Sequence, residues 1–309
     1  MKFSVTIPTY KPYYLKECIN SVLTQSYTDF ELIIVNDNSP FDIDSIINSF
    51  SDNRIRYYKN TIGFGTEKVV QNWNKCLNYA LGDFIICMGD DDKLLPNFLK
   101  DLAVLIDQHT KLDIFYSHTQ LIDENSKVIK TFPLRPERES IYEMIWRRWN
   151  GGQMCIGDYC YRTSALKEKG GFYYLPFAWG SDAISAYEAA KNMGIANTSK
   201  PGFQYRVNSH SISSKSDNIE GKIQALKEER KWFEDFFKRE APTSKDQILL
   251  AQLRKKMHPH FVHMLSGDII YGVGKHPIQG MKYWTTHREE VGLSMWELTK
   301  CFIHGIVGR

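Results

Sequence analysis

The stretch GDFIICMGDDD occupies residues 82–92 and ends a continuous apolar run in three consecutive aspartates. Phe84–Met88 is apolar without alternation, which is typical of a central strand buried on both faces. Asp90, Asp91 and Asp92 then lie side by side, and neighbouring carboxylates repel one another unless a cation neutralises them. Oxygen ligands suit Mg²⁺ or Mn²⁺, which bridge protein carboxylates and substrate phosphates. The stretch indicates either a metal–diphosphate site or a solvated acidic turn that caps the following helix.

Apolar runs alternate with amphipathic stretches over the first 120 residues. Strands are expected at 3–7, 30–35, 55–58, 84–88 and 112–117, with helices near 13–24, 43–50, 68–81 and 96–108. This alternation predicts an α/β domain with a largely parallel sheet. The loops Pro8–Tyr10, Asn36–Asn38 and Asp90–Asp92 should meet at its carboxyl edge, where open α/β sheets bind ligands.

From about residue 127 the pattern is less regular. Arg135–Glu139 and Trp146–Gly152 resemble loop or lid material, although a half-buried amphipathic helix is slightly favoured for Trp146–Trp149. Gly157–Leu166 is expected to be a strand running into a short helix, and another helix should run from about Trp179 to Met193. Beyond 216, amphipathic helices are expected at 219–238, 247–265, 277–290 and 294–306.

Composition excludes several classes of protein. The chain has 309 residues and a net charge of +3, which does not indicate nucleic-acid binding. Its 6 cysteines form no CxxC pair and read as reduced thiols of a cytosolic protein. We expect no signal peptide and no membrane span, since no apolar stretch approaches about 18 residues. Neither GxGxxG nor a P-loop is present, so the usual dinucleotide and NTPase hypotheses lack support.

Several motifs together resemble family 2 of the glycosyltransferases, which has the GT-A fold. They are Val5–Tyr10, Gln25–Ser39, Gly82–Ile85, Asp90–Asp92 and Gly180–Asp182. The resemblance covers about residues 1–215. It implies a catalytic GT-A domain over 1–215, with a nucleotide-sugar half at about 1–125 and an acceptor half at about 126–215. Residues 216–309 are expected to form a helical C-terminal extension.

The resemblance also implies roles for single residues. It places Asp37 on the nucleotide base, Pro8, Thr9 and Tyr10 along the nucleoside, and Asp182 as catalytic base. Asp90 and Asp91 match the ribose- and metal-contacting pair of the DxD motif. Because Gly89 replaces the first aspartate of that motif, the pattern leaves open which two of the three aspartates contact the ribose and the metal. We expect Asp91 and Asp92 to be the metal ligands and Asp90 to contact the nucleotide.

The chain departs from the family pattern at other positions too. Asn36 occupies a position where the family often has aspartate. Ser181 occupies the position before the catalytic base, where the family more commonly has glutamate. Trp73-Asn74 replaces an Arg-Asn pair, so Lys68 is a candidate substitute cation, and Asn74 stays a candidate nucleotide contact. Arg206, His210 and Trp179 are candidates for contact with the diphosphate or the acceptor, each with a structural alternative. Asp37 has the alternative of capping the turn 36–40, and Asp182 that of an ordinary N-cap.

These residues predict an inverting, metal-assisted glycosyltransferase with Mn²⁺ or Mg²⁺ as cofactor. The resemblance, and not the residues, implies that it builds a bacterial surface polysaccharide. The donor is expected to be a nucleotide sugar, most simply a UDP-sugar, and the acceptor a glycan or lipid-linked hydroxyl. Asp182 would take the acceptor proton. The rival hypotheses are a non-catalytic nucleotide-sugar-binding protein and a nucleotidyltransferase. Cytoplasmic localisation is expected, with peripheral membrane contact through the C-terminal helices as an option beside packing on the protein's own core.

Overall fold

The computed structural model describes residues 1–208 and 218–307 of the chain. They fall into two compact units, Met1–Ser214 and Lys215–Arg309. The first unit holds the sheet and the second is helical.

A single sheet forms the centre of the first unit, with its strands in the order β3-β2-β1-β4-β9-β6-β10-β5. Strand β7 pairs with β6, and β8 pairs with β10. The strands are β1 (Phe3–Thr9), β2 (Phe30–Asn36), β3 (Ile55–Lys59), β4 (Phe84–Cys87), β5 (Lys93–Leu94), β6 (Ile114–Ile122), β7 (Val128–Thr131), β8 (Arg138–Glu139), β9 (Tyr159–Arg162) and β10 (Ile195–Arg206). The first four strands in this order run parallel, and β9 is antiparallel to both of its neighbours, β4 and β6. The prediction of an α/β domain is confirmed.

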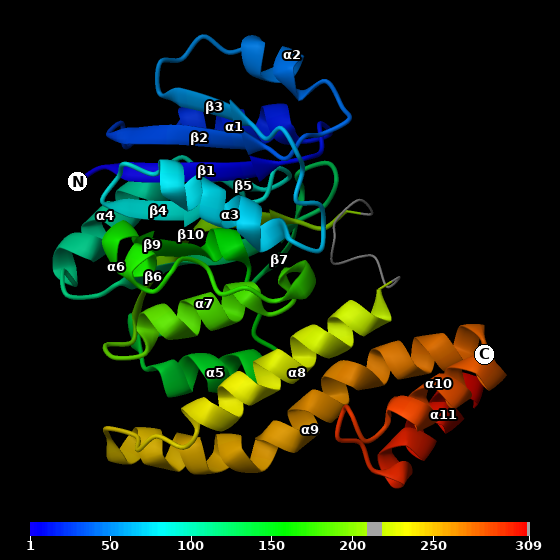
Figure 1. Ribbon diagram of the computed structural model, residues 1–309. Helices are drawn as coiled ribbons and strands as arrows, with labels where there is room; N and C mark the ends of the chain where they lie inside the picture. Colours follow the sequence, from blue (N-terminus) through cyan, green and yellow to red (C-terminus); the bar gives the residue numbers. More distant parts are fainter. Residues whose placement is uncertain (209–217, 308–309) are drawn as a thin grey trace. The chain divides into compact units, whose positions relative to one another are not determined.

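Helices connect and cover these strands. They are α1 (Leu15–Leu23), α2 (Ile43–Asn48), α3 (Val69–Tyr79), α4 (Phe98–Gln108), α5 (Ile141–Trp149), α6 (Thr163–Glu168) and α7 (Ser181–Ala190), with 3-10 turns η1 (Ile156–Asp158) and η2 (Pro176–Ala178). Figure 1 shows β3, β2, β1 and β4 stacked downwards in that order, with α5 and α7 below the sheet.

The core follows from the sequence pattern. All seven residues of β2 and all four of β4 are buried, because helices cover both faces of the sheet. Helix α1 buries Leu15, Cys18, Ile19 and Val22, the i, i+3, i+4, i+7 stripe of an amphipathic helix. Each fully buried leucine, isoleucine or valine contributes about 1.5–3 kcal/mol.

The loop or lid interpretation of Trp146–Gly152 is wrong for most of its length. Ser140 and Glu143 form a capping box that starts helix α5, which continues to Trp149. Arg147 on this helix pairs with the buried Glu139. The alternative of a half-buried amphipathic helix is confirmed, because the local cap outweighs the bulky, charged composition.

The second unit contains α8 (Ile219–Phe236), α9 (Ser244–Lys275), α10 (Pro277–His287) and α11 (Met295–Val307). Helix α9 is ten residues longer than expected at its C-terminal end, where glycines weaken the sequence signal. Helix α10 packs closely on this end of α9 through a glycine of its own: a Cβ on Gly280 would lie 2.9 Å from the Gly272 carbonyl oxygen. Tertiary packing overrides the low helix propensity of the α9 glycines. Among the described residues, no helix has the length and apolar character needed to cross a bilayer.

Candidate functional site

The carboxyl ends of β1 and β2 bring two predicted loops into contact. Asp37 N donates to the Thr9 carbonyl oxygen at 2.9 Å, and Ser39 Oγ donates to the Tyr10 carbonyl oxygen at 2.6 Å. Pro8 and Thr9 close strand β1, while the Tyr10 side chain is exposed. The sheet therefore gathers Pro8–Tyr10 and Asp37 at one edge.

Asp37 is buried and fixes the loop that follows β3. Its Oδ1 accepts hydrogen bonds from Asn60 Nδ2 at 2.9 Å and Phe64 N at 2.8 Å, and its Oδ2 accepts from Gly65 N at 3.0 Å. The turn 36–40 is capped by Asn36 and not by Asp37, since Asn36 Oδ1 accepts from Ser39 N at 2.8 Å. Asp37 is thus held at this edge of the sheet by its hydrogen bonds to the loop 60–65.

Two asparagines that the sequence interpretation missed, Asn60 and Asn72, extend the hydrogen-bond network around Asp37. Asn60 Nδ2 also donates to Asn72 Oδ1 at 3.1 Å, and Asn72 Nδ2 donates to the Val35 carbonyl oxygen. Both asparagines are buried, so their polar groups link β2, β3 and α3. The sequence did contain a signal for them: Asn60 is a polar residue directly after β3, and Asn72 is a polar residue on the apolar side of α3.

Asp90, the first aspartate of the cluster, is hydrogen-bonded to the loop that follows β1. One oxygen, Oδ2, accepts from Thr9 Oγ1 at 3.1 Å and from the backbone N–H groups of Tyr10 and Lys11, both at 2.8 Å. Burial and the charge of Asp91 raise the pKa of Asp90, while these N–H donors lower it. Asp90 therefore stabilises the conformation of the loop predicted to lie along the nucleoside.

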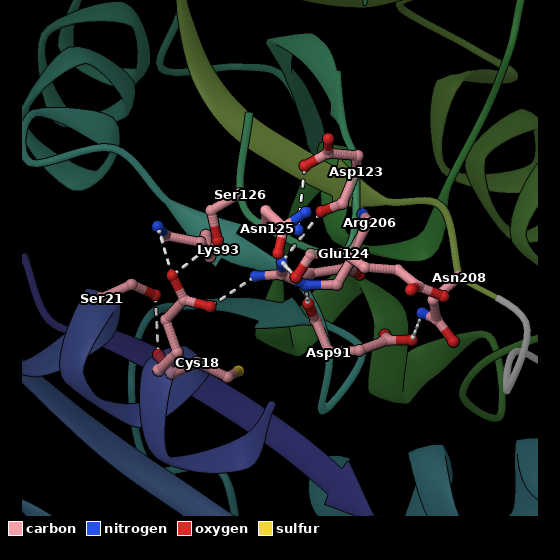
Figure 2. Close-up of polar contacts among 12 residues, drawn as sticks. Cys18, Ser21, Asp91, Lys93, Asp123, Glu124, Asn125, Ser126, Arg206 and Asn208 are labelled. Atoms are coloured by element: carbon pink, nitrogen blue, oxygen red, sulfur yellow. Dashed lines mark hydrogen bonds and ion pairs between the residues drawn. The ribbon is translucent and has the colours of Figure 1, made fainter. Parts of the chain in front are cut away.

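Asp91 is partly exposed at the same edge. Its Oδ2 accepts from Asn208 Nδ2 at 2.7 Å, and its main-chain carbonyl accepts from Arg206 Nε at 2.7 Å (Figure 2). Both contacts come from the end of β10, more than 110 residues away in the chain.

Asp92, by contrast, is buried and 3% exposed, and its Oδ1 accepts from Arg206 N at 3.0 Å. Burial and the Asp91 charge raise the pKa of Asp92 well above its ordinary value. A Cβ at position 89 would lie 2.9 Å from oxygens of both Asp91 and Asp92, which explains the glycine there. Within residues 1–208 and 218–307, no group of three acidic, histidine or cysteine side chains is arranged to hold a metal.

The diphosphate role predicted for Arg206 is corrected by its burial. The guanidinium is 0% exposed and bonds to Glu17, the Asp91 carbonyl and two further carbonyls. It also lies 4.3 Å from the Tyr14 ring centroid. With these partners and no exposed surface, Arg206 serves the structure around Asp91 rather than contacting a ligand.

The contacts of Asn74 favour a structural role over the nucleotide contact predicted from the sequence. Its Oδ1 accepts from Phe172 N at 2.8 Å and its Nδ2 donates to the Phe172 carbonyl at 3.3 Å. Both ends of the amide are engaged by one backbone residue, so Asn74 joins α3 to the turn at Gly171.

The other predicted contacts are placed as follows. Lys68 is exposed at the N-cap of α3. The Trp179 ring stacks on Phe177 with centroids 5.0 Å apart, just before α7. His210 lies outside the described residues.

Asp182 lies in the first turn of α7, whose N-cap is Gly180 with φ of 89°. The N-cap alternative is therefore wrong for Asp182, although its Oδ1 accepts from Ala183 N at 2.8 Å. Its surroundings desolvate the carboxyl and raise its pKa, and the charge of Arg148 opposes this rise. A raised pKa favours the role of a proton acceptor near neutral pH.

Asp158 is a buried acid that sequence reasoning missed. Its carboxylate accepts from Thr119 Oγ1 and from Cys155 N, the latter at 2.7 Å. Burial raises the pKa of Asp158 to about 7, although the hydrogen bonds from Thr119 and Cys155 and the charge of Arg135 lower it. No local pattern marked it, because Asp158 follows a glycine in an otherwise apolar segment.

The buried Cys155 thiol is affected by the charges of Asp92, Asp158 and Asp182. Burial raises its pKa well above the ordinary value, and the charges of Asp158, Asp92 and Asp182 raise it further. All three carboxylates therefore lie within electrostatic range of one sulfur.

The fold and this edge define a GT-A type nucleotide-sugar transferase architecture. The crystal structure of S. aureus TarS 1–349 in complex with UDP-GlcNAc superimposes with a TM-score of 0.66, covering 87% of this chain and 81% of that one at 20% identity. At that identity the likeness concerns the fold alone.

The chain belongs to glycosyl transferase family 2, whose sequence model matches residues 4–168. It is 33% identical over 148 residues to the uncharacterized glycosyltransferase MJ1057 of Methanocaldococcus jannaschii, covering 46% of this chain and 49% of that protein. It is 35% identical over 106 residues to the GalNAc(5)-diNAcBac-PP-undecaprenol beta-1,3-glucosyltransferase of Campylobacter jejuni, covering 33% of each. The chain thus spans about half the length of the first relative and a third of the second.

Proposed function

We propose that the protein is an inverting glycosyltransferase that moves a sugar from a nucleotide-diphosphate donor to a hydroxyl of a glycan or lipid-linked acceptor. The observation that carries this proposal is the meeting of Asp37, Asp90 and Asp91 at the carboxyl edge of a family 2 sheet. A UDP-sugar is the proposed donor, which is consistent with the UDP-GlcNAc bound by the similar TarS structure.

The donor nucleoside would lie along Pro8–Tyr10, with its base at Asp37. The hydrogen bonds from Thr9, Tyr10 and Lys11 to Asp90 support this arrangement, because they fix the loop before the ligand arrives. Exposed Lys68, at the start of α3, is the proposed cation for the donor.

A divalent cation, Mn²⁺ or Mg²⁺, would be held by Asp91 together with the donor's phosphates. Asp91 fits because it is partly exposed at the edge, whereas Asp92 is buried against Arg206 N. Asp90 is also partly exposed, but its Oδ2 already accepts from Thr9 Oγ1, Tyr10 N and Lys11 N. One or two carboxylates plus phosphates are the usual ligands of such ions. When bound, the ion would neutralise charge on the leaving diphosphate.

Asp182 would accept the proton of the attacking acceptor hydroxyl. The acceptor oxygen forms a bond to the anomeric carbon as the bond to the diphosphate oxygen breaks, and the proton passes to the carboxylate. Attack opposite the leaving group inverts the anomeric centre without a covalent enzyme intermediate. The raised pKa of Asp182 supports this role, because it makes the carboxylate a better base.

We place the protein in the cytoplasm, with peripheral contact to the inner membrane surface through α11. Leu298, Cys301 and Gly305 are buried on one side of this helix. Its other side exposes an apolar set within an arc of about 120°: Met295, Trp296, Ile303, Ile306 and Val307. Lys300 Nζ lies 4.8 Å from the Trp296 ring centroid, which suits the boundary of an anionic bilayer. Residues 211–309 carry a net charge of +4.

Flotation with vesicles tests this contact. Wild-type protein should float with vesicles rich in anionic lipid, and the pair Trp296→Ser and Ile303→Ser should reduce the bound fraction. Exposed Ile248 on α9 provides the control change Ile248→Ser. Equal binding by both variants would remove the membrane contact from the proposal.

A hydrolysis and transfer screen tests the enzyme itself. Nucleotide sugars are incubated with the full chain in Mn²⁺, Mg²⁺ or EDTA, and free nucleoside diphosphate is measured. Turnover of one donor class with Mn²⁺ or Mg²⁺, lost in EDTA, is expected. Donor binding without turnover that Asp182→Asn leaves unchanged would point instead to a nucleotide-sugar-binding protein.

A further inference from the structure

Arg206 cross-links the parts of the chain around Asp91. Its Nε donates to the Asp91 carbonyl at 2.7 Å, and its Nη1 donates to the carbonyls of Asp123 at 3.0 Å and Glu124 at 3.2 Å. Its Nη2 pairs with Glu17 Oε2 at 2.6 Å. Figure 2 shows Arg206 among Asp91, Asp123 and Glu124. A buried arginine is tolerated because its donors are satisfied in this way.

The backbone around Arg206 holds the same acidic turn. Arg206 N donates to Asp92 Oδ1 at 3.0 Å, and Asn208 Nδ2, two residues on, donates to Asp91 Oδ2 at 2.7 Å. Asp91 itself lies in a turn between β4 and β5, outside regular secondary structure. Its position therefore depends on contacts from the end of β10.

Glu17 on α1 is the counter-ion and is itself fixed. Its Oε1 accepts from Lys93 Nζ at 2.6 Å and from Ser126 Oγ at 2.7 Å. Burial alone would raise the pKa of Glu17, but these hydrogen bonds and the charge of Arg206 bring it below the ordinary value. The ionised pair is thus maintained at neutral pH.

We propose that Arg206, with Glu17, is a positioning residue that sets the Asp91 carboxylate for a divalent cation. This inference rests on the proposed function, in which Asp91 holds that cation. Arg206 itself has no exposed surface with which to touch substrate. It acts on the ligand residue through the Asp91 carbonyl, and groups that orient metal ligands affect metal affinity strongly.

The chain offers a matched control in Arg162. Its Nη2 donates to the carbonyls of Thr110 at 2.6 Å and Leu112 at 2.8 Å, and its Nε pairs with Asp113. Its guanidinium also lies 4.8 Å from an aromatic ring centroid, that of Phe84. Arg162 thus has the same kinds of partner as Arg206 without contact to the aspartate turn.

The test measures Mn²⁺ affinity in saturating UDP, and UDP affinity in EDTA, by calorimetry on the full chain. Arg206→Lys keeps the charge but loses the planar set of donors, so the Kd for Mn²⁺ should rise about 10-fold or more. Arg162→Lys should leave this Kd unchanged, and both variants should bind UDP in EDTA as the wild type does. Unchanged Mn²⁺ affinity in Arg206→Lys, or an equal loss in Arg162→Lys, would overturn the inference.

Glu17→Gln provides a second variant if Arg206→Lys does not fold. Glutamine preserves the shape and one acceptor while removing the charge, so the Kd for Mn²⁺ should rise about 5-fold. An unchanged Kd here contradicts the inference too. Failure of the wild type to bind Mn²⁺ and UDP together would instead refute the proposed function, so the two failures are distinguishable.

Discussion

Asn208 Nδ2 donates a 2.7 Å hydrogen bond to Asp91 Oδ2, joining the end of β10 to the turn after β4. This bond constrains the carboxylate that the proposal assigns to the cation. Asp92, next in the chain, is instead bonded to Arg206 N inside the protein. Adjacent aspartates of the same motif thus have different surroundings, and the difference can be measured.

Asp91→Asn should lower kcat/KM with Mn²⁺ at least about 100-fold, because it removes the charge that holds the ion. UDP binding in EDTA should stay within about two-fold of the wild type. Both quantities are obtained from steady-state kinetics and calorimetry. Asp92→Asn is the comparison, and it should alter thermal stability more than Mn²⁺ affinity. A full metal response in Asp91→Asn would contradict the assignment.

Asp182→Asn should lower kcat about 10²–10⁴-fold while leaving donor affinity unchanged, as expected for loss of a general base. The wild-type activity should fall as pH decreases, since only the ionised carboxylate accepts a proton. Because the pKa of Asp182 is raised, this acidic limb should lie above the ordinary aspartate range. Glu188→Gln on the same helix is the control and should retain activity. A pH profile that is flat on the acid side would exclude Asp182 as the base.

Asp158→Asn should stabilise the protein above pH 7. The folded state holds the Asp158 proton up to about pH 7, whereas the unfolded chain releases it near pH 4. Stability from this group is thus complete below about pH 4 and is lost as pH rises to about 7. Asparagine mimics the protonated acid, accepting from Cys155 N while Thr119 Oγ1 keeps its bond to the Ser117 carbonyl.

Chemical unfolding at pH 5 and pH 8 checks this expectation. The variant should exceed the wild type at pH 8 by on the order of 2–4 kcal/mol, with a smaller difference at pH 5. A variant that is less stable at both pH values would show that the ionised Asp158 stabilises the fold.

Asn74→Ala should lower the free energy of unfolding by about 1–2 kcal/mol, because both polar groups of Phe172 lose their partner. The KM for the nucleotide sugar should stay within about two-fold, since the amide serves the fold. Thermal unfolding and donor kinetics provide the two readouts. A large rise in KM at unchanged stability would restore the nucleotide role predicted from the sequence.

Much of the sheet was predictable because the signal is local. The runs 30–35 and 84–88 are apolar without alternation, and β2 and β4 occupy them almost residue for residue. The carboxyl-edge loops were also predictable, since parallel strands place equivalent ends together. The end of α9 and the start of α5 were less predictable, because glycines weaken the helix signal late in α9 and a capping box starts α5.

The sequence by itself determined the order of strands and helices, the family and the polar residues at the strand ends, since each depends on neighbouring residues along the chain. Only the tertiary structure decided what several of those polar groups do. Arg206 became the buried partner of Glu17, 189 residues away, and Asn74 that of Phe172, 98 residues away. Asp158 acquired its raised pKa through burial by distant segments. Desolvation and hydrogen bonding depend on contacts in space, which no local pattern of residues specifies.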